Sequence, residues 1–166
     1  MVLKNIFKWA GLFVLAFVLQ TTLVPSISIF QFRPDLLMLV LFALALKAGV
    51  IPAVYIGFFL GLAQDLYSPS ILGQNALSKT IAGFFAGLFN EKLVRIDPIF
   101  KAVLLLLMFL LNDSVYLIVQ MVKTGGSMQG IGMELITATL PRALYSLLLG
   151  MIPILWENYS QATVRR

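Results

Sequence analysis

The stretch from Arg33 to Gly87 constrains the fold most, because its long apolar runs are interrupted by very few charges. The charged residues in it are Arg33, Asp35, Lys47, Asp65 and Lys79. A core helix of a soluble protein presents a polar face every three or four residues, and this stretch shows no such face. Because the whole chain is 60% hydrophobic and 11% charged, the sequence predicts an all-α membrane protein.

We expect residues 1–166 to form a single domain of six transmembrane helices. The predicted spans are about 7–24, 34–46, 50–66, 72–90, 99–121 and 132–156. At about 1.5 Å per residue, the second and third cover only about 18 and 24 Å of a hydrocarbon core about 30 Å thick. Two short spans or a re-entrant hairpin would both fit. Lys47 favours two short spans, because a re-entrant turn would bury its ammonium group near the bilayer centre.

The first apolar run, from Trp9 to Val24, follows Lys4 and Lys8 and therefore mimics a signal peptide. No small-x-small cleavage pattern follows it, so we interpret it as an uncleaved first helix. With the N-terminus inside, eight Lys and Arg residues face the cytoplasm and three face outward, namely Arg33, Lys79 and Lys123. The positive-inside rule then predicts that both termini are cytoplasmic.

The composition argues against catalysis and against nucleic-acid binding. The chain has no Cys and no His, which removes thiolates and imidazoles as metal ligands, nucleophiles and acid-base groups. Asp35 and Asp65 share the predicted outward side, but no nucleophile, metal set or cofactor loop accompanies them. The basic residues stand singly between apolar runs instead of forming a patch with aromatics. We expect no enzymatic activity, no cofactor, no metal and no nucleic-acid partner.

The third and fourth segments each contain a glycine packing motif. Gly57, Gly61 and Asp65 recur every four residues and share one helix face, and Gly83 and Gly87 repeat the small-xxx-small pattern. These glycines either pack the two helices against each other or receive a helix of a partner protein. Arg33-Pro34-Asp35 is interpreted as a helix start at the interface or as a polar anchor for a neighbouring helix.

A polar turn follows the third segment. Gln64 and Asp65 precede Ser68-Pro69-Ser70 and Gly73-Gln74-Asn75, which are ordinary turn and capping residues. A turn this polar at a membrane surface is also a candidate contact site. Both interpretations remain open.

Two charges fall in the middle of the last two segments. Asp113 lies about 15 Å before the turn that joins these segments and Arg142 about 16 Å after it, so antiparallel helices would bring them level. An unpaired charge at this depth is costly, so we expect an intramembrane salt bridge between them, with Asn112, Tyr145 or Ser146 completing the hydrogen bonds. The pair is interpreted as a structural clasp or as part of a polar pathway. Pro141 and Pro153 are expected to kink the last helix.

The chain resembles the MreD family of bacterial rod-shape-determining membrane proteins. The resemblance rests on Arg33-Pro34-Asp35-Leu36-Leu37, on Gly57 to Leu66, on Ser68 to Leu77, and on Pro141 to Leu149. It covers nearly the whole chain in length, order and spacing.

The resemblance implies a non-enzymatic scaffold subunit of the cell-elongation complex in the bacterial cytoplasmic membrane. Such a subunit binds MreC and connects MreB filaments to peptidoglycan synthesis by a RodA-type glycosyltransferase and a class-B penicillin-binding protein. The residues we expect to contact the partner are Pro34, Asp35, Gly57, Gly61, Gln64, Asp65 and Gly73.

The family is also similar in architecture to the substrate-binding subunits of energy-coupling-factor transporters, which gives a second hypothesis. A substrate-capturing transport subunit would have a pocket between the outer loops and the last two helices. A third hypothesis is a protein that handles lipids or cell-wall precursors, for which an outward-open groove lined by Arg142 would be the sign.

Overall fold

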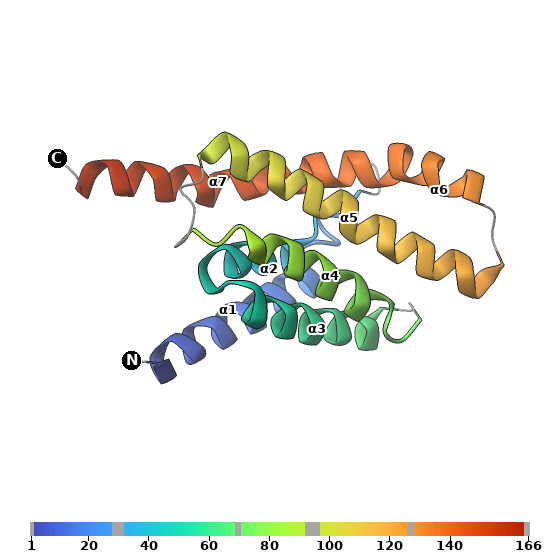
Figure 1. The fold of residues 1–166 in the computed structure, drawn as a ribbon, viewed down its shortest axis with the longest axis horizontal. Coiled ribbons are helices and arrows are strands. Elements are labelled where there is room, and N and C mark those ends of the chain that lie inside the picture. Colours follow the sequence, from blue (N-terminus) through green and yellow to red (C-terminus); the bar gives the residue numbers. More distant parts are fainter. Residues whose placement is uncertain (1, 28–31, 69–70, 92–96, 126–127, 165–166) are drawn as a thin grey trace.

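The computed structural model describes residues 2–27, 32–68, 71–91, 97–125 and 128–164, with side chains described except in 2–10, 128–129 and 155–164. This part of the chain is all-helical, as the sequence predicts (Figure 1). The helices in chain order are α1 (Val2–Thr22), α2 (Leu36–Ala48), α3 (Val50–Tyr67), α4 (Gln74–Leu88), α5 (Pro98–Thr124), α6 (Met128–Glu134), the π-helix η1 (Leu135–Thr139) and α7 (Leu140–Val164).

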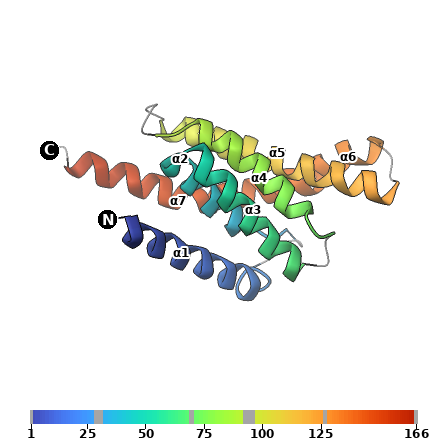
Figure 2. The same ribbon diagram turned by 60° about the horizontal axis from the view of Figure 1, so that its bottom comes forward.

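Three stretches of described helix are long and apolar enough to cross a membrane: Val50–Tyr67, Pro98–Thr124 and Gly130–Ile154. Gly11–Thr22 and Leu36–Ala48 are shorter apolar helices. The ends of the chain lie at one end of the bundle and the α3–α4 connection lies at the other (Figures 1 and 2). The six predicted segments thus correspond to six helical stretches, the last of which contains α6, η1 and α7.

The third segment was predicted to within one residue of α3, but the expectation that it is too short to span was wrong, and so was the predicted length of the fourth segment. α3 has 18 residues and is long enough to span, whereas α4 has only 15. α4 begins late because Gly73 is left-handed, with φ 92°, and it ends at Leu88, where the Phe89 amide turns back to the Ala86 carbonyl at 3.1 Å. α2, with 13 residues, is short as predicted.

α2 is the centre of the core, because it contacts α1, α3, α4, α5 and α7 (Figure 2). Its residues Leu37, Leu41 and Ala45 are completely buried, which explains why the sequence shows no polar face there. Asp35 caps the helix by accepting a hydrogen bond from the Met38 amide at 2.9 Å. At its other end Gly49 alone joins α2 to α3, with φ 87°, a conformation that favours glycine.

Candidate functional site

The glycines of the two small-xxx-small motifs form the contact between α3 and α4. A Cβ atom on Gly57 would lie 2.5 Å from the Lys79 carbonyl oxygen, and one on Gly83 would lie 2.6 Å from the Ala53 carbonyl oxygen. A Cβ atom on Gly61 or on Gly87 would also lie less than 3.0 Å from backbone atoms of the facing helix. Of the two roles predicted for these glycines, the structure therefore shows internal packing. α4 covers the face of α3 that carries Gly57 and Gly61. Their role in binding a partner stays a prediction.

Asp65 holds the start of α4 against the end of α3. Its carboxylate accepts hydrogen bonds from the Gly73 amide at 2.9 Å, the Asn75 amide at 2.9 Å and the Ala76 amide at 3.1 Å. The Asn75 side-chain amide donates a fourth bond at 2.9 Å. A carboxylate at a helix N-terminus satisfies unpaired backbone donors and interacts favourably with the helix dipole. Asp65 thus caps the start of α4 from the other side of the polar turn.

Asp35 forms an ion pair that the sequence analysis missed. The Lys79 ammonium group lies 2.8 Å from the Asp35 carboxylate, and the Lys79 side chain is 0% exposed. Assigning Lys79 to the outward-facing loops was therefore wrong. The predicted fourth segment, 72–90, already placed Lys79 inside a helix, but the sequence did not show that this side of α4 faces the core. One signal was available, since a cation inside an apolar segment needs a partner.

Arg142 of α7 forms an ion pair with Asp113 of α5, in agreement with the expected pairing. Asn112 donates to the same carboxylate at 2.9 Å. Ser146 donates to the Arg142 carbonyl at 2.9 Å and accepts from the Asp35 amide at 3.1 Å. Tyr145 instead donates to the Ile27 carbonyl at 3.0 Å. The two ion pairs, Arg142–Asp113 and Lys79–Asp35, are thereby connected through Ser146.

The π-helix η1 stands directly before Pro141. The Leu140 amide bonds the Leu135 carbonyl five residues back, and Pro141, which has no amide hydrogen, follows. The sequence predicted a kink at this proline. The structure shows a widened turn, with Thr139 buried at its end.

Exchanging Asp113 and Arg142 is expected to restore stability that each single neutralisation removes. Because Arg142 is 40% exposed and Asp113 only 6%, Arg142→Gln should cost about 1–3 kcal/mol by leaving the buried carboxylate unpaired. Asp113→Asn should cost less, because water reaches the guanidinium. SDS titration of the purified protein would measure both. Equal stability of the single variants and the exchanged one would contradict a stabilising pair.

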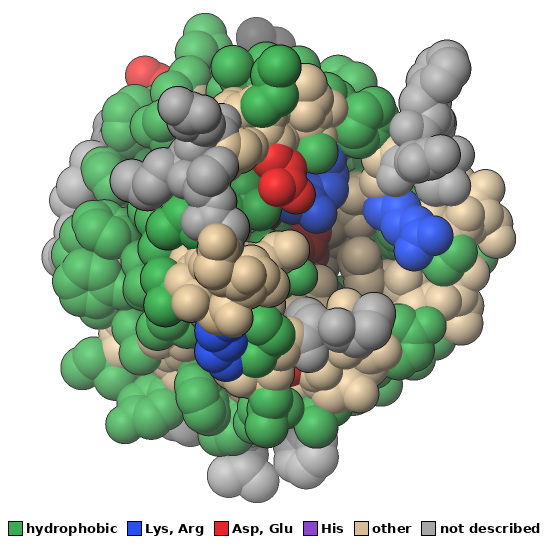
Figure 3. All heavy atoms as spheres, turned by 90° about the vertical axis from the view of Figure 1, so that its right-hand side faces the viewer, with side chains coloured by type: hydrophobic (Ala, Val, Ile, Leu, Met, Phe, Trp, Pro, Cys, Tyr) green, Lys and Arg blue, Asp and Glu red, His purple; other side chains and the backbone are tan. Residues whose placement is uncertain are grey.

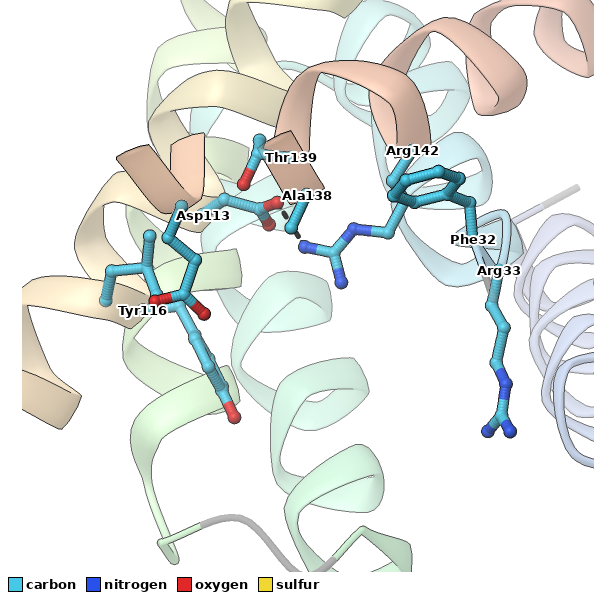
Figure 4. Close-up of a pocket in the computed structure, with 9 residues that line it drawn as sticks. Phe32, Arg33, Asp113, Tyr116, Ala138, Thr139 and Arg142 are labelled. Carbon is cyan, nitrogen blue, oxygen red and sulfur yellow. Dashed lines mark hydrogen bonds and ion pairs between the residues drawn. The ribbon is translucent and has the colours of Figure 1, made fainter. Parts of the chain in front are cut away.

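Two cavities lie beside these ion pairs, and Arg33 and Arg142 line both. The first, of about 390 Å³, also has Asp113, Tyr116 and Glu134 in its walls. Figure 4 shows Arg142 reaching toward Asp113, with Tyr116 and Arg33 on opposite sides. At this end of the molecule, acidic and basic side chains gather around a hollow bordered by hydrophobic ones (Figure 3).

The second cavity, of about 510 Å³, lies between the ends of α1 and α3 and the start of α2. Gln20 of α1 lines it and ties α1 to α2, because it donates to the Pro34 carbonyl at 3.2 Å and accepts from the Leu36 amide at 2.7 Å. Gln64 lines it as well, and its Oε1 atom is buried without a hydrogen-bond partner in the part of the chain that the structure describes.

The residues predicted to contact a partner thus divide into two groups. Pro34, Asp35, Gly57, Gly61 and Asp65 have contacts within the chain through the hydrogen bonds, ion pair and packing described above. Gln64 faces the second cavity, and a Cβ atom on Gly73 would meet nothing within 4 Å. Gln74, predicted as a turn residue, begins α4 and donates to the Tyr116 carbonyl at 2.9 Å. Gln20 was not predicted as a site residue, and the signal that could have found it is an amide inside an apolar segment.

Residues 2–157 of the chain match the family model described as rod shape-determining protein MreD. The chain belongs to the MreD family. The resemblance recognised in the sequence is thereby confirmed. The family match assigns the chain to the rod-shape-determining membrane proteins. Searches among curated proteins and among solved structures gave no match.

Proposed function

We propose that this chain is a non-enzymatic scaffold subunit of the bacterial cell-elongation complex that binds MreC. The observation that carries the proposal is the family match over residues 2–157. Through MreC the subunit supports rod shape and lateral peptidoglycan synthesis, with MreB filaments, a RodA-type glycosyltransferase and a class-B penicillin-binding protein as indirect partners. Binding by shape suits a bundle in which backbone contact and buried ion pairs fix the helices.

The proposed location is the bacterial cytoplasmic membrane, with both termini inside. Burial of Lys79 supports this orientation, because removing that residue from the outward set changes the Lys and Arg count from eight against three to eight against two. Both chain ends also lie at the same end of the bundle (Figure 1).

For the contact with MreC we propose the outward edge where α3 ends. The Gly57–Gly61 face is covered by α4, so substitutions there would act on a partner only by disturbing α3 and α4. At the edge, Tyr67 and Leu72 are each 64% exposed and Gly73 is open. Gln64 lies one turn before the end of α3. This edge combines exposed apolar side chains with the polar turn, as interface cores and rims do.

Site-specific photo-crosslinking would test this edge in the membranes of a rod-shaped bacterium that contains MreC. A photoreactive phenylalanine analogue at Tyr67 or Leu72 is expected to crosslink MreC. The same analogue at Ile99, which is 79% exposed at the other end of the bundle, is the matched control and should not. If the tagged chain retains MreC but neither outward position crosslinks it, the edge is wrong. If the chain does not retain MreC at all, the scaffold function is wrong.

A second candidate function is substrate capture for a small-molecule transporter. The first cavity favours it, because it lies between the residues before α2 and the helices α5, η1 and α7, where such a subunit is expected to have its pocket. Its volume of about 390 Å³ lies within the ordinary range for small-ligand sites, about 300–1,000 Å³. A vitamin-sized molecule retained through purification would favour this function over the scaffold.

A further inference from the structure

We propose that the second cavity binds the phosphate group of a membrane lipid whose headgroup also carries hydroxyl groups. This site adjoins the outward edge proposed for MreC and shares Gln64 and Tyr67 with it, but the inference does not depend on that partner. It rests on two arginines, a glutamine with a buried amide oxygen and several apolar side chains, and these residues line a single cavity of about 510 Å³.

The arginines supply the positive charge. Arg33 is exposed, and no hydrogen bond or ion pair joins its guanidinium to the described residues. Arg142 uses its Nη2 atom for Asp113, which leaves its other nitrogen donors available. Asp35 is the one carboxylate among the described residues that line this cavity, and Lys79 already neutralises it. Guanidinium groups bind phosphate through paired, charge-assisted hydrogen bonds, so a phosphate fits between these side chains.

The amide oxygen specifies a hydroxyl group. Gln64 Oε1 is buried and has no hydrogen-bond donor among the described residues. A buried acceptor without a donor costs free energy that a ligand hydroxyl would recover. A phosphate oxygen cannot satisfy this atom, because both are acceptors. The pair of requirements, an anion for the arginines and a donor for Gln64, describes a headgroup such as that of phosphatidylglycerol.

The apolar wall fits acyl chains. The rings of Phe17 and Tyr67 lie edge to face with their centroids 6.1 Å apart, and both line the cavity. Val24 and Leu37 line it too and are buried. Phe17 comes from α1 and Tyr67 from the end of α3, so two apolar helices form this wall of the cavity. A phosphate near the arginines would therefore have its lipid tails beside these side chains, as an amphipathic ligand requires.

Native mass spectrometry of the full-length chain in detergent would test the site, with dioleoyl phosphatidylglycerol as the probe and dioleoyl phosphatidylcholine as the reference lipid. We expect saturable phosphatidylglycerol binding that Arg33→Gln weakens about tenfold or more, since a charge-assisted contact is lost. Lys123→Gln removes an exposed lysine that does not line the cavity and is the matched control, with binding unchanged.

A second variant tests the hydroxyl requirement. Gln64→Leu should weaken phosphatidylglycerol but not dioleoyl phosphatidic acid, which lacks the headgroup glycerol. Competition by glycerol phosphate at the same concentration would support a phosphate site whose ligand is water-soluble, while competition by the lipid alone supports a membrane lipid. Equal binding of phosphatidylglycerol and phosphatidylcholine, or unchanged binding by the folded Arg33→Gln variant, would overturn the proposal.

Discussion

Gly61→Leu is expected to destabilise the bundle by about 3 kcal/mol or more, because it inserts a side chain where two backbones touch. A Cβ atom at this position would lie less than 3.0 Å from the backbone of Asn75 and Ala76. Backbone atoms in a capped helix start cannot rotate away as a side chain would, and Asp65 holds this start by three hydrogen bonds from backbone amides and one from the Asn75 side chain. The substitution should therefore separate α3 from α4 and break the Asp65 cap.

The measurement is unfolding of the purified protein by SDS titration, with the elution profile in mild detergent as a second readout. Gly132→Leu is the matched control, because it makes the same change in α6 where a Cβ atom would meet nothing within 4 Å. We expect the control to unfold with the wild-type midpoint. An unchanged midpoint for Gly61→Leu would show that α3 and α4 are not in close contact. A folded Gly61→Leu variant that no longer retains MreC would instead assign this face to the partner.

Lys79→Met is expected to cost about 3 kcal/mol of stability, because it leaves the Asp35 carboxylate without its cation inside the bundle. The Asp35 side chain is 14% exposed, so water compensates little of the lost ion pair. The Asp35 carboxylate also caps α2 through the Met38 amide, and α2 contacts five other helices. Damage at this position should therefore spread through the core.

Adding Asp35→Asn to Lys79→Met should restore most of the lost stability. Asparagine caps a helix about as well as aspartate, and the double variant no longer contains an unpaired charge. Lys123→Met, which changes an exposed lysine at the end of α5, is the control and should shift stability by no more than about 0.5 kcal/mol. SDS titration of all three variants would measure these effects. A Lys79→Met protein as stable as the wild type, or a double variant no better than the single one, would contradict a stabilising role for the pair.

Much of the helical organisation could be predicted, because apolar runs and glycine spacing are local signals. The runs predicted six helical stretches, and α2 is short as expected. Counting residues on either side of a turn predicted that Asp113 and Arg142 lie at the same depth, and the two side chains form an ion pair. The length of α4 could not be predicted, because it depends on how Asp65 and Gly73 close the turn that precedes this helix.

The candidate site was less predictable. Lys79 was assigned to the surface because a single sequence does not show which way a helix faces, and the structure points this residue at Asp35, 44 positions away. Gln64 was predicted as a partner contact and Gln20 was not predicted at all, and the two line one cavity only because α1, α2 and α3 enclose it. Arg33 was recognised as a helix-start residue, but its place beside Arg142 depends on the packing of α7.

Hydropathy and motif spacing identify this chain as a helical membrane protein of the MreD family, because both signals act over a few turns of one helix. The sequence also determined that α3 and α4 carry glycines able to approach another backbone, without saying whose. Only the tertiary structure decided that each of these helices is the other's partner, that Lys79 neutralises Asp35, and that Arg33, Gln64 and Arg142 line one cavity. The physical reason is that ion pairs, backbone contacts and cavities depend on distances between residues far apart in the chain, and packing alone sets those distances.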